Sequence, residues 1–342
     1  MRKLLLLTAL IPLLLPGAAA GAAEDHAPAW RDTPSGVDAQ LRGLDVVSKR
    51  VVWASGSKGT VLRTTDAGRT WRQVGPPGTE ALEFRDIEAF DADRAVILSI
   101  GPGGDSRIYR TEDGGENWRL SFQNPDEKAF YDCVSFFDNR RGLALSDPVD
   151  GKFRVLSTED GGRTWSVNPA DGMPDALPGE FAFAASGQCL TTAGRDAWIA
   201  TGGGAKARVL RSGDGGRHWR AEETPIPSGE AAGVFSVVFR DPGHGVAIGG
   251  DYKVPATSGA TAVSSDGGRS WRTPPQSPAG YRSGLAWRGN TVLAVGPTGS
   301  DYSPDGGRHW RSFDTGSFDS VSCAHGACWA SGAKGRIGVL DR

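Results

Sequence analysis

Short apolar runs alternate with turn-forming residues along most of the chain, in a unit that is clearest between residues 84 and 122. This unit predicts four strands, which we call A to D, at residues 84–90, 95–100, 106–111 and 117–122. The 49 glycines and 21 prolines suit many short strands and tight turns, and no window shows the period of an amphipathic helix. The pattern therefore predicts an all-β fold.

An eight-residue box, Thr64-Thr65-Asp66-Ala67-Gly68-Arg69-Thr70-Trp71, sets the period of the repeat. A hydroxyl or Asp side chain can close a turn on backbone N–H groups, Gly takes the positive φ of a tight hairpin, and Trp buries apolar surface between sheets. Six boxes end on tryptophans 39 to 54 residues apart, a spacing typical of one four-stranded propeller blade per repeat. Their structural aspartates are Asp66, Asp113, Asp160, Asp214, Asp266 and Asp305.

A seventh, incomplete unit follows the last box. It has strands A to C near residues 318–323, 328–332 and 336–340, and no strand D. Trp30-Arg31 stands alone near the other end of the chain and matches the dipeptide that opens strand D in most units. We therefore expect one domain over residues 24–342, a seven-bladed β-propeller of four-stranded antiparallel blades whose last blade is closed by the N-terminal strand.

Residues 1–23 are predicted to be a signal peptide, since a basic start, a twelve-residue apolar run and a small-residue cleavage zone follow one another. The run is too short to span a bilayer, so the mature chain is expected to have no transmembrane segment and to be periplasmic or secreted. It is also expected to be a monomer. The formal net charge of −2 argues against a nucleic-acid partner.

Cys323 and Cys328 flank four residues that can form a hairpin, which predicts a cross-strand disulfide in an oxidising compartment. A zinc site with His325 is disfavoured because further ligands are missing. Cys133 and Cys189 occupy similar places in adjacent repeats, and either a disulfide or two buried thiols is compatible with the sequence. The Gly-rich runs precede strands rather than helices, so they are not expected to form a dinucleotide-binding loop. No metal or cofactor is expected.

Residues 52–71 resemble the repeat of the photosystem II stability/assembly-factor family and its relatives in non-photosynthetic bacteria. The box alone is similar to the bacterial-neuraminidase (Asp-box) repeat of sialidases and related propellers. The resemblance covers essentially the whole mature chain. It implies a seven-bladed propeller with an exported scaffold or assembly role.

Candidate site residues are expected on the face opposite the boxes, where loops vary. One set comes from the long connections of blades three to five and could form a polar rim: Asp147, Glu180, Asp251 and Tyr252. The alternative is that these loops are only exposed insertions. A second set follows the first apolar residue of each strand A and should surround the channel mouth: Arg42, Arg85, Tyr131, Gln188, Ser236, Arg282 and Asp319.

Three arginines in this ring favour a carboxylate or another anionic group, because guanidinium binds carboxylates in a bidentate fork. The alternative is pairing within the ring, as between Arg85 and Asp132 or Arg282 and Asp319. Two functions compete: a non-catalytic propeller that binds a protein partner and helps to assemble or stabilise an envelope complex, and a sialidase-like glycoside hydrolase acting on a glycan. The arginine signature that opens sialidases is absent, which favours the first.

Overall fold

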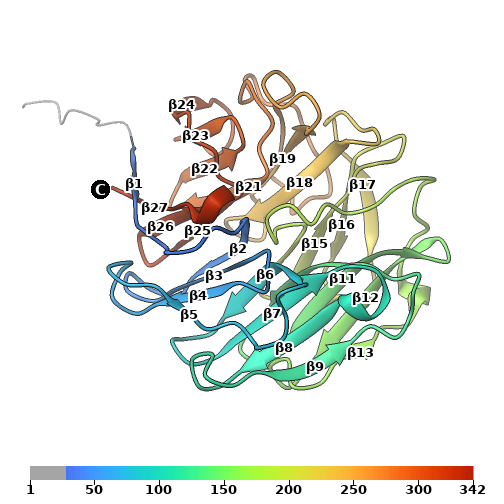
Figure 1. The fold of residues 1–342 in the computed structure, drawn as a ribbon. Coiled ribbons are helices and arrows are strands. Elements are labelled where there is room, and N and C mark those ends of the chain that lie inside the picture. The colour runs from blue at the N-terminus through green and yellow to red at the C-terminus, as the bar shows by residue number, and fades with distance from the viewer. Residues whose placement is uncertain (1–27, 342) are drawn as a thin grey trace, which may run out of the picture.

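The computed structural model describes residues 28–341, which form 27 β-strands and three short 3₁₀ helices. The strands make seven separate antiparallel sheets that follow one another around a ring in chain order, from blue to red in Figure 1. This confirms the predicted seven-bladed propeller. The predicted signal peptide, residues 1–23, lies outside the described residues. None of the described helices is long and apolar enough to cross a membrane.

Each blade runs from an inner strand outwards, and the blades are numbered 1 to 7 in the chain order of their inner strands. The inner strands are β2 (Leu41–Val46), β6 (Glu83–Ala89), β10 (Tyr131–Phe136), β14 (Leu190–Ala193), β18 (Ala232–Phe239), β21 (Gly284–Arg288) and β25 (Ser320–Ala324). The second strands are β3 (Val52–Gly56), β7 (Ala95–Ile100), β11 (Gly142–Val149), β15 (Asp196–Ala200), β19 (Gly245–Asp251), β22 (Thr291–Gly296) and β26 (Ala327–Ser331). The third strands are β4 (Val61–Thr64), β8 (Arg107–Thr111), β12 (Lys152–Thr158), β16 (Arg208–Ser212), β20 (Ala260–Ser264), β23 (Gly299–Ser303) and β27 (Ile337–Leu340). The outer strands are β5 (Arg72–Gln73), β9 (Arg119–Gln123), β13 (Ser166–Val167), β17 (Arg220–Glu223), β24 (Arg311–Asp314) and β1 (Trp30–Asp32).

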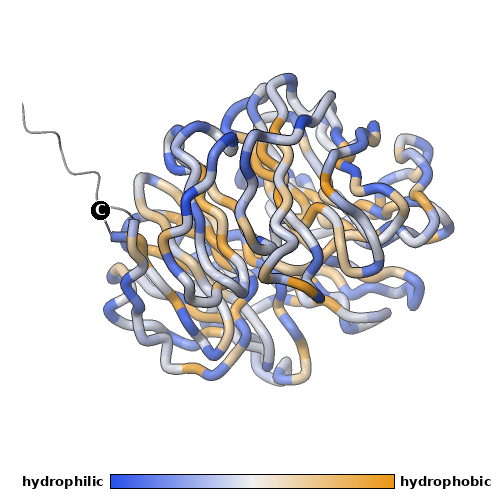
Figure 2. Tube along the Cα trace, turned by 90° about the horizontal axis from the view of Figure 1, so that it is seen from above, coloured by the Kyte–Doolittle hydropathy of each residue, from blue (hydrophilic) through white to orange (hydrophobic). Residues whose placement is uncertain are grey.

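The core is divided among the interfaces between blades. Every inner strand contacts the inner strands of both neighbouring blades, from β2 round to β25 and back to β2. Hydrophobic residues gather in the strands, while hydrophilic ones gather in the connections (Figure 2). Trp53, Trp198 and Trp329, each on a second strand, are among the largest fully buried side chains. Each blade is therefore stable only with its neighbours beside it.

The N-terminal strand closes the last blade, as the isolated Trp30-Arg31 predicts. Strand β1 pairs antiparallel with β27, with Trp30 opposite Leu340 and Asp32 opposite Gly338. The Trp30 ring lies 5.5 Å from that of Phe318, and its indole N–H donates to the Ser300 hydroxyl at 3.0 Å. Blade 7 therefore has no unpaired third strand.

Blade 5 departs from the prediction, because it has three strands and only an isolated bridge between Val263 and Arg272 in place of the fourth. In blade 1 the backbone N–H of Val74 continues the outer pairing by donating to Val61 O at 2.8 Å. The corresponding residue of blade 5 is Pro274, which has no N–H to donate. The outer strand ends there for lack of a donor.

The six boxes form almost identical turns between third and outer strands. In the first, the Thr64 hydroxyl donates to Asp66 at 2.9 Å and accepts the Gly68 N–H at 3.0 Å, while Asp66 accepts the Thr70 N–H at 3.0 Å. These bonds to the charged form lower the pKa of Asp66 to about 2. The boxes are thus turns closed by their own side chains, and the hydroxyl and carboxylate groups of these side chains form hydrogen bonds within the box.

Candidate functional site

The residues around the channel mouth differ from the predicted ring in blades 3, 5 and 6, where the register of the inner strand is one residue away from the predicted one. Several inner strands also carry a β-bulge at the ring position. The bulges lie between Leu41 and Gly43, Phe84 and Asp86, Tyr131 and Cys133, and Val234 and Ser236. The equivalent ring position therefore holds Arg42, Arg85, Asp132, Gln188, Phe235, Ser283 and Asp319. The ring has two arginines and two aspartates rather than three arginines.

Tyr131 and Arg282 lie one residue away from the ring position and face elsewhere. Tyr131 is 1% exposed and packs against Phe122, and burial raises its pKa to about 12. Arg282 is 3% exposed, and its Nε lies 2.6 Å from Asp301 Oδ2. The partner of Arg282 is thus Asp301 and not Asp319. Arg282 therefore belongs to a buried ion pair that stabilises blade 6.

A segment of residues 181–188, which we call the plug, crosses the mouth of the channel. Strand β14 begins at Leu190, later than the predicted start near Phe183, because Phe183 belongs to this segment. The plug contacts inner strands on opposite sides of the ring: Ala184 O accepts from Arg85 at 2.9 Å, and the Gln188 amide donates to Leu285 O at 2.7 Å and Val321 O at 2.9 Å. The channel is therefore closed on this face.

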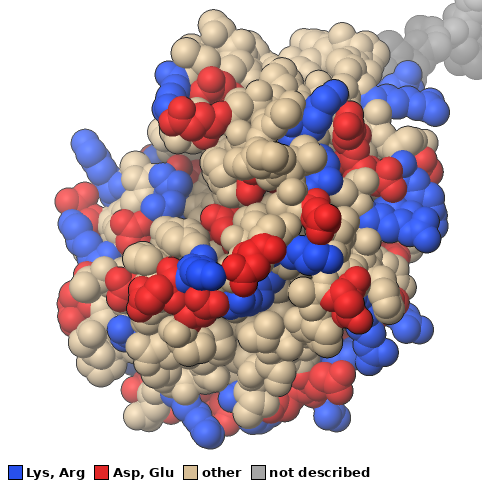
Figure 3. All heavy atoms as spheres, turned by 90° about the vertical axis from the view of Figure 1, so that its right-hand side faces the viewer, with Lys and Arg blue, Asp and Glu red and all other residues tan. Residues whose placement is uncertain are grey.

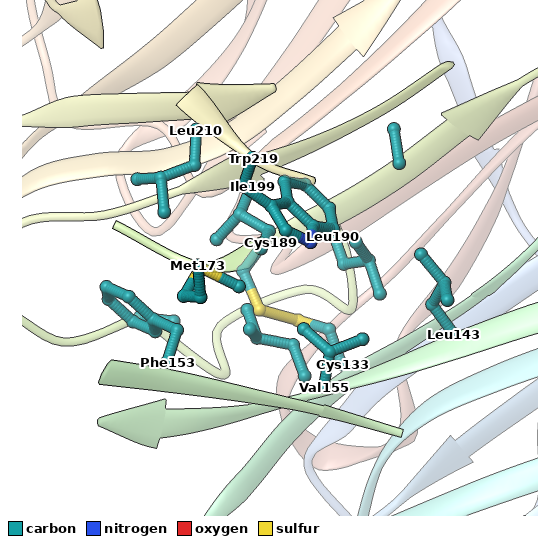
Figure 4. Close-up of a cluster of buried hydrophobic side chains, with 13 residues drawn as sticks. Cys133, Leu143, Phe153, Val155, Met173, Cys189, Leu190, Ile199, Leu210 and Trp219 are labelled. Carbon is teal, nitrogen blue, oxygen red and sulfur yellow. A yellow bond between two sulfur atoms is a disulfide. The ribbon is translucent and has the colours of Figure 1, made fainter. Parts of the chain in front are cut away.

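A disulfide anchors the end of the plug to blade 3. Cys189 is bonded to Cys133, with Cα atoms 6.1 Å apart, inside an apolar cluster between blades 3 and 4 (Figure 4). The sequence left the state of these two cysteines open. The other pair is also joined: Cys323 and Cys328 face each other across the β25–β26 hairpin with Cα atoms 4.1 Å apart, so neither thiol can bind zinc.

Arg42 and Arg85 have different surroundings at the mouth. Arg85 donates twice to Glu83, at 2.6 and 2.8 Å, and once to the plug. The pKa of Arg85 is lowered mainly by burial and to a smaller extent by the positive charge of Arg42. The predicted pairing of Arg85 with Asp132 is replaced by this pairing with Glu83. The Nε of Arg42 is buried and has no hydrogen-bond partner among residues 28–341. Arg42 as a whole is half-buried and forms no ion pair among the described residues, although its charge partly offsets the effect of burial on the pKa of Asp319. Its guanidinium can therefore still pair with an anionic group.

Beside the arginines lies a group of aromatic side chains of which the sequence analysis named only Tyr252. Phe183 of the plug stacks on Phe235 at 3.8 Å, and Tyr281 meets Phe235 at 4.7 Å. Tyr252 completes the group with its ring 6.5 Å from that of Phe183, and 47% of Tyr252 is exposed. A buried aromatic cluster, covered by the exposed Tyr252, thus lies near Arg42, whose charge acts on Tyr281.

The carboxylates predicted to rim a polar pocket are each engaged by hydrogen bonds in the structure. The Glu180 side chain is fully buried and binds Arg208 at 2.5 and 2.8 Å, and the Thr201 hydroxyl at 2.6 Å. Asp147 accepts the Ala182 N–H at 2.8 Å, whereas Asp251 accepts the Lys253 N–H at 2.8 Å beside a cavity of 490 Å³ between blades 4 and 5. Glu180 is a structural residue.

Several acids near the channel have raised pKa values because of burial. The pKa of Asp45 rises to about 6 and that of Asp147 to about 7. Burial also raises the pKa values of Asp86, Glu88 and Asp132 well above their usual range, with neighbouring carboxylates adding to the rise. At neutral pH the folded channel therefore holds protons that the unfolded chain has released.

This predicts that stability falls as pH rises from about 5 to 8. An acid whose folded pKa exceeds its unfolded value of about 4 makes the folded state bind more protons in this window, so protonation favours folding. We expect Tm at pH 5 to exceed Tm at pH 8 by roughly 5 °C in differential scanning calorimetry. Below about pH 4 the trend reverses, because the box aspartates, such as Asp66 and Asp305 with pKa values of about 2, lose their charge.

Asp147→Asn is the matched variant, since its amide oxygen can still accept the Ala182 N–H. It should raise Tm at pH 8 and leave Tm at pH 5 nearly unchanged. A wild-type Tm that rises between pH 5 and 8 contradicts the assignment.

Solved propeller structures share this architecture. YCF48 from Cyanidioschyzon merolae aligns with a TM-score of 0.67 at 17% identity over 91% of this chain and 98% of that chain. A structure of YCF48 bound to D1 peptide aligns with a TM-score of 0.62 at 16% identity over 96% and 100%. The WD40 β-propeller domain of Doa1 gives 0.60 at 12% identity over 92% and 98%. No protein-family model and no curated protein matches this chain.

The structural likeness to YCF48 agrees with the seven-bladed propeller that the resemblance of the repeat implies. At these identities the likeness establishes the fold, and the ligand must be argued from the site.

Proposed function

We propose that this chain is a non-catalytic propeller that binds a protein partner through the face opposite the boxes, and that it serves as an exported assembly or stability factor for an envelope complex. The observation that carries the proposal is the plugged channel mouth. At this mouth lie the half-buried Arg42, which forms no ion pair among the described residues, and Tyr252, 47% of which is exposed, and both residue types suit a protein contact. The YCF48 structure with a bound D1 peptide supports the same use of a related fold.

The predicted leader and the two disulfides support an exported location. Disulfides form and persist in oxidising compartments and are rare where thiols are kept reduced. Among the described residues all four cysteines are paired. The complex that the propeller serves would therefore be assembled outside the cytoplasm.

A glycosidase is the second candidate, and one observation favours it. Asp132 and Asp147 interact, and the pKa of Asp147 rises to about 7, as expected of a general acid. However, Asp132 is 1% exposed and Asp147 is bonded to the plug. Glu180, the third acid of the predicted rim, is occupied by Arg208.

Capture experiments with envelope extracts test the binding proposal. We expect a partner retained by the wild-type protein to be lost from R42Q/Y252S, because the two changes remove the Arg42 guanidinium and the exposed Tyr252 ring and leave the hydrogen bonds of the plug in place. The control R69E/R72E changes two exposed arginines at the box end of blade 1 and should retain the partner. Equal retention by R42Q/Y252S and the control would refute the assigned face.

A glycoside hydrolysis screen of the same preparations tests the alternative. Under the binding proposal the wild-type protein gives no rate above background. A reproducible rate that is abolished in folded D147N would establish the glycosidase instead.

A further inference from the structure

A groove on the box face, between blades 5 and 6, differs from its counterparts around the ring. It encloses about 690 Å³, within the range of ligand sites. Its wall on blade 5 includes Pro274 and Pro275, which replace the fourth strand. The groove is wide because the outer pairing of this blade stops at Arg272.

The charges that line this groove are mainly positive. Arg272 and Arg308 are exposed, and neither forms an ion pair within residues 28–341. The acid of the lining, Asp305, is committed to its own box, since it accepts from the Ser303 hydroxyl at 2.9 Å and the His309 N–H at 2.9 Å. Two arginines are therefore available to an incoming anion.

The third arginine is held in place on the wall of blade 6. Arg240 lies 5.4 Å from the centre of the Trp287 ring and donates to the Asn290 amide oxygen at 3.0 Å. Asp241 balances part of its charge at 3.0 Å. Arg240 thus presents a fixed guanidinium beside Trp287 and the two prolines. We call the groove lined by Arg240, Arg272 and Arg308 the basic groove.

Other grooves on the same face are electrically balanced. The groove between blades 3 and 4 encloses about 440 Å³ and is lined by Glu159, Asp171 and Asp214 as well as by Arg141, Arg195 and Arg217. Between blades 2 and 3, Glu112 pairs with both Arg110 and Arg163. Basic and acidic side chains are likewise interspersed over the side of the molecule shown in Figure 3. The basic groove is thus a local exception on a chain with a net charge of −2.

We propose that the basic groove is a second binding site, which takes an acidic segment of a protein. Carboxylates would pair with Arg272 and Arg308, whose planar guanidinium groups match carboxylate geometry. The Asn290 amide and the prolines suit the polar backbone and apolar parts of an extended peptide. Because the site lies on the face opposite Arg42 and Tyr252, the propeller would hold two partners at once.

Binding of fluorescein-labelled hexaglutamate, measured by fluorescence anisotropy at low salt, tests this site. We expect R272E/R308E to weaken binding by about tenfold or more, because two attractive charges become repulsive, and R272K/R308K to retain most of it. The matched control R195E/R217E changes two exposed arginines of the balanced groove and should bind as the wild-type protein does. R42Q/Y252S should also bind normally, which separates this site from that of the proposed function.

Three results would overturn the proposal. They are no binding of hexaglutamate by the wild-type protein, an equal loss in R195E/R217E, and tighter binding of a heparin hexasaccharide through the same two arginines. The last would assign the groove to an anionic glycan rather than to a protein. The four substituted arginines, Arg195, Arg217, Arg272 and Arg308, are all exposed, so the variants at these positions should retain the wild-type Tm.

Discussion

Arg282→Ala should lower the free energy of unfolding by about 3–5 kcal/mol. The side chains of Arg282 and Asp301 are 4% and 5% exposed, and their ion pair is supported by bonds from Arg282 to Tyr281 O at 2.9 Å and to the Thr298 hydroxyl at 2.8 Å. Removing the guanidinium leaves Asp301 as an unpaired buried charge. The midpoint of urea unfolding measures the loss.

Two controls separate this cost from a general effect of losing an arginine. Arg42→Gln, at the channel mouth, should change the free energy of unfolding by less than about 1 kcal/mol. R282M/D301L should recover much of the loss, because apolar residues of similar volume remove both charges together. A single Arg282→Ala variant as stable as Arg42→Gln would show that the Arg282–Asp301 ion pair does not stabilise the fold.

Loss of the Cys133–Cys189 disulfide should have a comparable effect. The two cysteines are 56 residues apart in sequence, and the chain-entropy relation gives about 4 kcal/mol for a loop of this length. C133A/C189A also frees one end of the plug. Calorimetry should therefore show a clearly lower Tm.

The second disulfide is the internal control, because Cys323 and Cys328 are only 5 residues apart. The same relation gives about 2 kcal/mol, so C323A/C328A should be destabilised about half as much as C133A/C189A. Equal losses, or the reverse order, would contradict the loop-length argument.

The architecture could be predicted from the sequence because the box is a local signal. Its hydroxyl, carboxylate and glycines close a turn among themselves, so each copy marks one blade wherever it occurs. The missing outer strand of blade 5 is also visible in the sequence, because Pro274 occupies the position at which the other blades need a backbone N–H. This position could have been identified by aligning the repeats with one another.

The site was less predictable, because it depends on single-residue shifts and on pairing between distant segments. The ring position of blade 3 is Asp132 and not Tyr131, because the inner strand begins at Tyr131 rather than at Phe130, and two adjacent aromatic residues give no signal that separates these registers. Glu180 resembles a functional carboxylate until the structure brings Arg208 against it. The plug could not be foreseen either, since its partners Leu285 and Val321 lie in other blades.

The pairing of β1 with β27 determines the order in which the molecule can fold. Trp30 and Leu340 meet only when almost the whole chain is available, so this contact has one of the largest sequence separations in the fold. Closing so long a loop costs little more free energy than closing half of it, but searches for distant partners slow folding. Until β27 has been synthesised, β1 has no partner, and the ring stays open between blades 7 and 1. Of the described strands, the first to be made is thus among the last to be placed.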